Sequence, residues 1–206
     1  MEQLRATPGG VRVSLPTHHR KYAEAVDGGV RGFETPSRRI ELHSEPMLDH
    51  GYPPLPSYEE PLVGPRTRSD LAERYPLVLT CAKHALFCET QHRAWPSLRR
   101  KALVPEVEIH PATAAERGIE DGAWVTIETP DARVRAQARL VGTLRLDVVS
   151  GQHGWWQACE ALDAPGFDAF GEDGANYNLL IGNDAIDPVS GSVPHRAYLC
   201  EVRPGR

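Results

Sequence analysis

The chain has 206 residues, of which 40% are hydrophobic and 25% are charged, and its formal net charge is −5 at pH 7. This composition is typical of a globular protein with a core, and the acidic balance argues against general affinity for nucleic acid. No apolar run approaches the ~20 residues of a membrane helix, and the N-terminus lacks the charged-then-apolar pattern of a secretion signal. The cysteines form no CxxC pair, so we expect free thiols.

Residues 1–74 are rich in chain breakers and have little periodic apolar pattern. Prolines punctuate the stretch DHGYPPLPSYEEPLVGPRTRSD (49–70), where they remove backbone donors and favour extended segments. One short strand is expected over RRIELHSE (38–45). We therefore expect residues 1–74 to form an extended segment, the tail of a preceding domain, and residues 75–206 to form a domain of their own.

From Tyr75 onward, short strands alternate with turns. A continuous apolar run predicts a buried strand at 76–80, and further strands are expected at 106–111, after Gly122, at 133–140, at 144–150 and at 195–202. Residues 133–140 alternate apolar and polar side chains, as a half-buried strand does. A short helix is expected over 111–118, between Pro111 and Gly118. The pattern predicts a mainly β protein with a few helices (α+β), built as a closed or nearly closed β-barrel.

The stretch LTCAKHALFCETQHRAWPSLRR (79–100) concentrates cysteines, histidines and basic residues. Cys81, His84, Cys88 and His92 are ligand types for zinc, but on one straight helix they would span roughly 16 Å, and zinc needs ligands within about 2.3 Å. Pairing of Cys81 with the nearby His84 as nucleophile and base would need spatial and not sequence adjacency. Otherwise both cysteines are expected to be small buried hydrophobes.

An anion-binding role suits the same stretch better. A buried strand ends at Thr80, and Lys83, Gln91, His92 and Arg93 follow in polar turns. Backbone N–H groups and arginine side chains at such a junction suit phosphate oxygens. The alternative is an exposed basic face with surface ion pairs.

Two later clusters also have two interpretations. QHGWW (152–156) is either a plug in the core or part of a binding site. ANYNLL (175–180) is either ordinary turn chemistry or a loop in which an Asn amide reads a purine or pterin edge.

The order of these motifs resembles the C-terminal part of the catalytic subunit in the dimethyl-sulfoxide-reductase family of molybdopterin oxidoreductases, in its polysulfide/thiosulfate-reductase and acetylene-hydratase-like branch. The matching pieces are GFETPSRRIELHSE (32–45), YPLVLTCAKH (75–84), TQHRAWPSLRR (90–100), VEIHPATAAERGIEDGAWVTIETPDARVRAQARL (107–140), GQHGWW (151–156), NYNLL (176–180) and DPVSGSVPHRAYLCEV (187–202). The resemblance implies that residues 75–206 form a molybdopterin dinucleotide-binding double-psi β-barrel, preceded by the extended Pro-rich segment.

The resemblance also implies a cofactor, bis(molybdopterin guanine dinucleotide) with Mo or W. By their position in the family, the residues expected at the phosphates and adjoining pterin are Thr80, Ala82 and Lys83. Those expected at the pterin and pyrophosphate are Gln91, His92 and Arg93. The rest of the cofactor would contact Trp155, Trp156 and Asn178, with His195 and Arg196 as further contacts. Many family members have a Thr-Thr-Gly-Arg-like turn where this chain has Thr80-Cys81-Ala82-Lys83. Lysine meets phosphate as a point charge and lacks the arginine fork.

The metal ligand and the iron–sulfur cysteines of the family lie upstream of the matched region, and four scattered cysteines do not form a cluster site. We therefore expect no catalysis by this chain alone. It would be a small subunit, a truncated product or an excised piece that shares the cofactor with a larger catalytic chain, in the cytoplasm or, carried by a partner, in the periplasm. The alternatives are a non-catalytic binding or assembly barrel, and a self-sufficient hydrolase that uses Cys81 or His153.

Overall fold

The computed structural model describes residues 2–14, 19–81, 83–171 and 174–205. The chain forms two compact units, Met1–Tyr58 and Glu59–Arg206. The first unit contains helix α1 (Glu2–Ala6), the 3-10 helix η1 (Lys21–Ala23), a hairpin of β1 (Ala25–Val26) and β2 (Gly29–Val30), and helix α2 (Glu45–Asp49). Within it the rings of Tyr22 and Phe33 stack with their centroids 4.2 Å apart.

The strand expected over residues 38–45 is wrong. Helix α2 begins at Glu45, the side chain of Ser44 accepts a hydrogen bond from the backbone N–H of Met47 (3.3 Å), and Pro46 lies in the first helical turn. These are the features that start a helix. Among the described residues of this unit, the only paired strands are β1 and β2, so an apolar alternation in 38–44 finds no neighbour with which to form a ladder.

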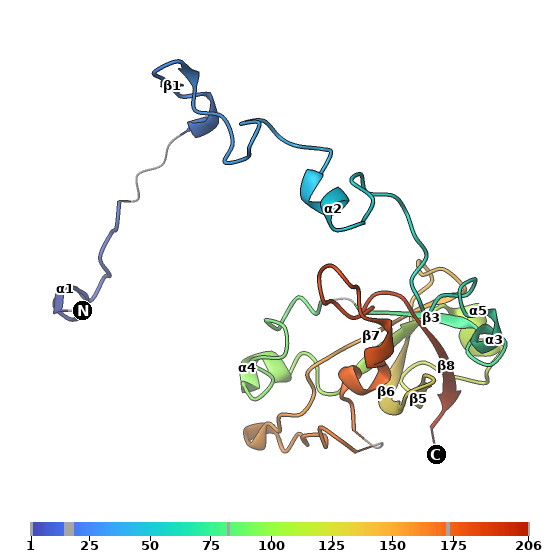
Figure 1. The fold of residues 1–206 in the computed structure, drawn as a ribbon. Coiled ribbons are helices and arrows are strands. Elements are labelled where there is room, and N and C mark those ends of the chain that lie inside the picture. Colours follow the sequence, from blue (N-terminus) through green and yellow to red (C-terminus); the bar gives the residue numbers. More distant parts are fainter. Residues whose placement is uncertain (1, 15–18, 82, 172–173, 206) are drawn as a thin grey trace. The chain divides into compact units, whose positions relative to one another are not determined.

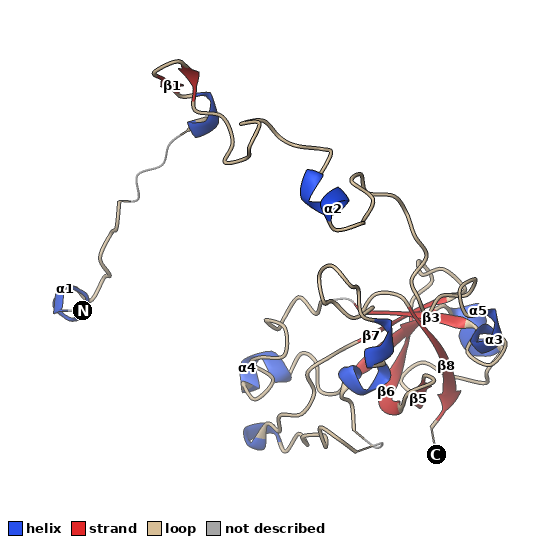
Figure 2. Ribbon diagram, viewed as in Figure 1, coloured by secondary structure: helices blue, strands red, loops and turns tan. Residues whose placement is uncertain are grey.

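The second unit holds the remaining elements, and Figure 2 shows that its strands gather in one place among short helices. In chain order they are α3 (Ser69–Ala72), β3 (Leu77–Cys81), α4 (Pro96–Arg99), β4 (Glu106–Ile109), α5 (Pro111–Ala115), β5 (Trp124–Glu128), β6 (Arg133–Leu140), β7 (Val148–Gly151), η2 (Glu160–Leu162), η3 (Tyr177–Leu180), η4 (Asn183–Ala185) and β8 (Tyr198–Pro204). In the part of the chain that is described, no helix is long and apolar enough to span a bilayer.

The strands of the second unit close into a barrel with the order β3-β7-β4-β6-β5-β8. Figure 1 labels β3, β5, β6, β7 and β8. The pairs β3–β7 and β4–β6 are parallel, whereas all the other neighbours are antiparallel. The prediction of a mainly β chain with a closed barrel is confirmed. Strand β7 is shorter than expected because residues 141–147 form turns, in which the N–H of Leu144 donates to the carbonyl of Val141 (3.2 Å).

The barrel core follows from the alternation in the sequence. In β6 the side chains of Val134, Ala136 and Ala138 are buried while the intervening residues face outward, as period-two patterning requires. Val63 and Leu71, which precede the barrel in the chain, pack into the same core. The segment from residue 59 onward is thus built into the second unit.

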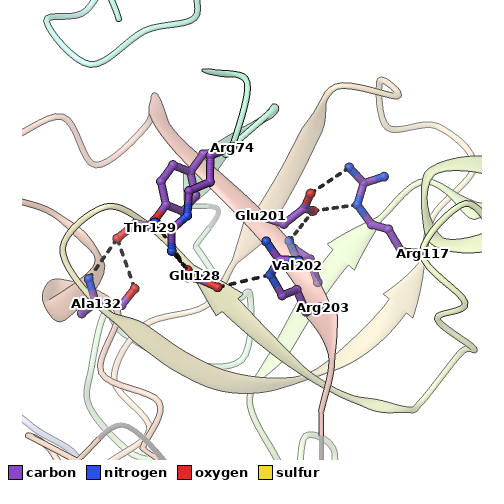
Figure 3. A network of polar contacts seen from close by, with 9 residues as sticks. Arg74, Arg117, Glu128, Thr129, Ala132, Glu201, Val202 and Arg203 are labelled. Atoms are coloured by element: carbon purple, nitrogen blue, oxygen red, sulfur yellow. Dashed lines mark hydrogen bonds and ion pairs between the residues drawn. The ribbon is translucent and has the colours of Figure 1, made fainter. Parts of the chain in front are cut away.

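Ion pairs on the barrel exterior connect its strands to neighbouring segments (Figure 3). Glu128, at the end of β5, accepts from Arg74 (2.8 Å) and from Arg203 of β8 (3.2 Å). Glu201 of β8 accepts from Nε of Arg117 at 2.7 Å. Partial burial acts to raise the pKa of Glu128, but the hydrogen bonds and charges of its two arginine partners outweigh it, and the net pKa lies below the ordinary value.

Candidate cofactor-binding site

A cavity of about 480 Å³ opens at one edge of the barrel. Strands β3 and β7 are parallel neighbours, so their carboxyl ends reach the same edge. The chain after β3 contributes Lys83 and Glu89 to the cavity wall, and the chain after β7 contributes residues 153–156. The start of η3 and the loop before β8 complete the wall with Asn178 and Arg196.

The cavity brings together many of the residues that the sequence assigned to the cofactor. Those that line it are Lys83, Trp155, Trp156, Asn178, His195 and Arg196. Thr80, Gln91, His92 and Arg93 do not line it, and Ala82 lies outside the described residues. A cofactor contact by any of these residues stays a prediction.

Arg93 is buried and does not line the cavity, but it contacts two segments that do. Its side chain is only 1% exposed, and its guanidinium donates to the carbonyls of Glu89 (2.8 Å) and His153 (2.5 Å). The guanidinium also lies 4.5 Å from the ring centroid of Phe87. Burial, and to a smaller extent the charge of Arg99, lowers the pKa of Arg93 to about 10. Arg93 therefore ties the loop after β3 to the loop after β7.

Arg99 is a second buried guanidinium, and sequence reasoning treated it only as part of a basic stretch. It is fully buried and donates to the carbonyls of Leu103 (2.8 Å), Gln157 (3.0 Å) and Pro165 (2.8 Å). No local signal separates Arg99 from its exposed neighbour Arg100, because two of these acceptors lie 58 and 66 residues away in the chain.

The paired tryptophans have different environments. Trp155 is 1% exposed, and the guanidinium carbons of Arg93 and Arg99 each lie 4.9 Å from its ring. Its indole Nε1 is buried and has no hydrogen-bond partner among the described residues, which is costly for a donor. Trp156 is 55% exposed at the cavity wall. The core-plug interpretation thus holds for Trp155 alone, and even there the donor is unsatisfied.

A chain of polar contacts crosses the cavity wall. The Sγ atom of Cys81 lies 2.9 Å from Nδ1 of His153, and Nε2 of His153 lies 3.3 Å from Oε2 of Glu89. Lys83 forms an ion pair with the other carboxylate oxygen of Glu89. The cysteines are free, and Cys88 is exposed, so the expectation that both Cys81 and Cys88 are buried hydrophobes is wrong.

Burial and neighbouring charges shift the pKa values of this cluster. Burial raises the pKa of the Cys81 thiol, and it lowers the pKa of His153, with a further lowering by the charge of Arg93. The hydrogen bond from Lys83 lowers the pKa of Glu89. The groups therefore favour a neutral thiol, a neutral imidazole and an ionised carboxylate.

The cavity wall also includes polar groups that are available to a ligand. Asn178 is exposed, and its backbone N–H is satisfied by Oδ1 of Asn176 (3.1 Å). His195 and Arg196 are exposed, and no ion pair involves either of them within the described residues. A concave site with aromatic walls, an amide and cationic groups suits a ligand that carries both rings and phosphates. The residues present therefore fit a pterin dinucleotide.

Comparison with known proteins agrees with this geometry. Residues 77–198 match the family model described as "Molydopterin dinucleotide binding domain". The chain is 38% identical to the dopamine dehydroxylase of Eggerthella lenta over 176 residues, which are 83% of this chain and 17% of that protein. It is 33% identical to the acetylene hydratase of Syntrophotalea acetylenica over 183 residues, which are 82% of this chain and 24% of that protein.

A solved structure gives the same result. The acetylene hydratase from Pelobacter acetylenicus superposes with a TM-score of 0.74 at 26% sequence identity, over 89% of this chain and 25% of that one. The chain spans about a sixth to a quarter of the length of these relatives. It belongs to the molybdopterin dinucleotide-binding domain family, and it corresponds to the C-terminal portion of members of the dimethyl-sulfoxide-reductase family of molybdopterin oxidoreductases.

Proposed function

We propose that this chain holds the dinucleotide of a bis(molybdopterin guanine dinucleotide) cofactor in the cavity at the edge of β3 and β7, for redox chemistry that a larger catalytic chain completes. The observation that carries the proposal is the cavity itself. It lies within the residues that match the family model, and residues assigned to the cofactor from the sequence alone line it.

The residues of the cavity divide by chemistry. The Asn178 amide has a donor and an acceptor for the edge of a guanine or pterin ring, and Trp156 offers an exposed ring face for stacking. His195 and Arg196 suit the phosphates. Lys83 is paired with Glu89, so phosphate binding by Lys83 requires exchange of that partner.

The remaining assigned residues act further from the cavity in this proposal. Arg93 fixes the two loops, Thr80 is the second-last residue of the strand that leads into the site, and Gln91 and His92 extend the surface on which the rest of the cofactor lies. Ala82 is proposed at the phosphates by its place in the sequence. When bound, the cofactor supplies Mo or W and a redox-active pterin, and the residues named here bind it, orient it and exclude water.

The partner chain supplies the metal ligand and, in some family members, an iron–sulfur cluster. The proposal of a larger partner rests on length, because the chain matches only 17% of the dehydroxylase and 24% of the hydratase. Those relatives carry out different reactions by name, so substrate choice is assigned to the partner.

Calorimetric titration of the full chain with guanosine diphosphate tests the binding site directly. We expect saturable binding, weaker binding of cytidine diphosphate, and roughly tenfold weaker binding after Asn178→Ala or Arg196→Ala, since one lost charged or bidentate hydrogen bond is worth about 1.5 kcal/mol. Arg100→Ala, which changes an exposed residue outside the cavity, serves as the control. Absence of binding, or equal loss in the control, would contradict the proposal and favour a non-catalytic barrel.

A further inference from the structure

Cys81, His153 and Glu89 form a linear cluster at the cavity that dinucleotide binding does not explain. Cys81 ends strand β3, His153 follows strand β7, and Glu89 lies in the loop after β3. All of them line the cavity. The Sγ–Nδ1 distance is 2.9 Å and the Nε2–Oε2 distance is 3.3 Å.

The contacts of His153 with its two neighbours point to one assignment of roles. An ionised carboxylate only accepts hydrogen bonds, so we assign the imidazole proton of His153 to Nε2, which lies 3.3 Å from Oε2 of Glu89. Nδ1 then carries a lone pair directed at the Cys81 thiol. Lys83 holds the Glu89 carboxylate from its other oxygen. The order of nucleophile, base and orienting carboxylate is that of an activated thiol.

Sequence adjacency pointed to a different histidine. Nδ1 of His84 accepts a hydrogen bond from the backbone N–H of Leu86 (3.2 Å), so this ring atom is used in a local turn. His153 lies 72 residues from Cys81 in the sequence, and the parallel pairing of β3 with β7 brings the two together.

We propose that Cys81 is a thiol–disulfide exchange site in the cavity, with His153 as its general base and Glu89 as a positioning residue. The co-reactant is a small disulfide, one half of which the cavity can hold. The Cys81 sulfur attacks one sulfur of the disulfide while its proton passes to Nδ1 of His153. The disulfide bond breaks, and the leaving thiolate takes the proton from Nδ1. The products are a mixed disulfide on Cys81 and one free thiol, with no net oxidation.

The resting cluster is a neutral pair, since burial raises the pKa of Cys81 and lowers that of His153. The groups whose charges reach the pair are Glu89, Lys83, Arg93, His195 and Arg196. Proton transfer thus accompanies attack and does not precede it. Because the adduct would fill the cavity, it would also exclude the dinucleotide, and this consequence rests on the proposed function.

The test is the reaction of the full, ligand-free chain with the aromatic disulfide dithiobis(nitrobenzoate), with the modified cysteine identified by peptide mass spectrometry. Exposed Cys88 serves as the reference within the same molecule, and buried Cys159 and Cys200 should stay unmodified. Below its own pKa an unassisted thiol loses about tenfold in rate per pH unit. We expect Cys88 to follow that slope and Cys81 to show a plateau wherever His153 is neutral.

Substitutions test whether His153 causes the plateau in the rate of Cys81. His153→Gln should slow Cys81 about tenfold or more at neutral pH and restore the tenfold slope, while the Cys88 rate in the same molecules stays unchanged. Continued protection of buried Cys159 and Cys200 reports an intact fold. Glu89→Gln should change the lowest pH at which the plateau in the Cys81 rate is seen. Cys88→Ser should leave the rate of the Cys81 reaction unchanged. An unreactive Cys81, or one with the slope of Cys88 and no response to His153→Gln, would overturn the proposal.

Protection by a ligand separates this inference from the proposed function. The exchange rate is measured without any nucleotide, so it stands or falls independently of dinucleotide binding. Guanosine diphosphate at saturation should slow modification of Cys81 and leave Cys88 unaffected. Equal rates with and without bound nucleotide would overturn the mutual exclusion alone.

Discussion

Two buried arginines hold the loops around the cavity. Arg93 joins the carbonyls of Glu89 and His153, and Arg99 joins those of Gln157 and Pro165. Trp155 lies against both guanidinium groups. A buried charge is costly unless it is hydrogen-bonded, so these carbonyls and the two arginines depend on one another. Nε of Arg93 is buried and has no partner among the described residues.

Replacement of Arg99 by Met, which retains much of the volume, should destabilise the second unit by roughly 3 kcal/mol, because several buried carbonyls lose a charged donor. The exposed neighbour gives a matched control: Arg100→Met should change stability by less than about 0.5 kcal/mol. Urea unfolding followed by tryptophan fluorescence measures both. Equal midpoints for the two variants would show that the buried guanidinium contributes nothing.

Glu128 should make the barrel sensitive to acid. Its pKa in the folded state lies below the ordinary value of 4.5, so its ion pairs with Arg74 and Arg203 contribute stability above that value. This contribution is lost as the pH falls through the folded-state pKa. The midpoint temperature of thermal unfolding should therefore fall less in Glu128→Gln than in the unmodified chain when the pH is lowered from neutral to below about 4. Parallel curves would contradict the assignment.

At the scale of elements, the barrel supplies rigid strands and the site lies in the loops that follow them. Gly154, directly after His153, has a φ of +84°, and a Cβ on it would lie 2.6 Å from Cα of Thr90. Gly154 therefore lets the loop after β7 pack against the loop after β3. Both loops line the cavity.

Substitution of Gly154 by Ala combines a strained backbone with this close approach. Gly122 is the matched control, since its φ is +76° and a Cβ there would meet nothing within 4 Å. Gly122→Ala should cost the strain alone, about 1–2 kcal/mol, whereas Gly154→Ala should cost more and also weaken nucleotide binding. Denaturant unfolding and calorimetric titration of both variants measure the difference. Equal losses of stability with unchanged binding would show that the close approach is unimportant.

Elements were easier to predict from the sequence than side-chain roles. The alternation in residues 133–140 predicted β6 because one face of that strand is buried. The same kind of pattern failed at 38–45, where Ser44 and Pro46 start a helix and no described strand lies alongside. The family resemblance named six residues that line the cavity and four that do not. The pairing of Cys81 with His153 depends on strand register across 72 residues, which local sequence does not encode.

At the scale of the whole molecule, the chain contains a closed barrel and a cavity but only a fraction of the length of its relatives. In the proposed function the site is shared, and the metal ligand lies on another chain. It follows that metal, pterin and partner should be recovered together or not at all.

Isolation of the tagged chain from the cells that produce it, at native expression, tests whether metal, pterin and partner are bound together. Elemental mass spectrometry would measure Mo and W, oxidative release would measure fluorescent pterin, and protein mass spectrometry would identify copurifying chains. We expect near-stoichiometric metal and pterin together with a larger chain, and loss of both signals after Asn178→Ala combined with Arg196→Ala. Recovery of the chain with no pterin, no metal and no partner would contradict the proposed function.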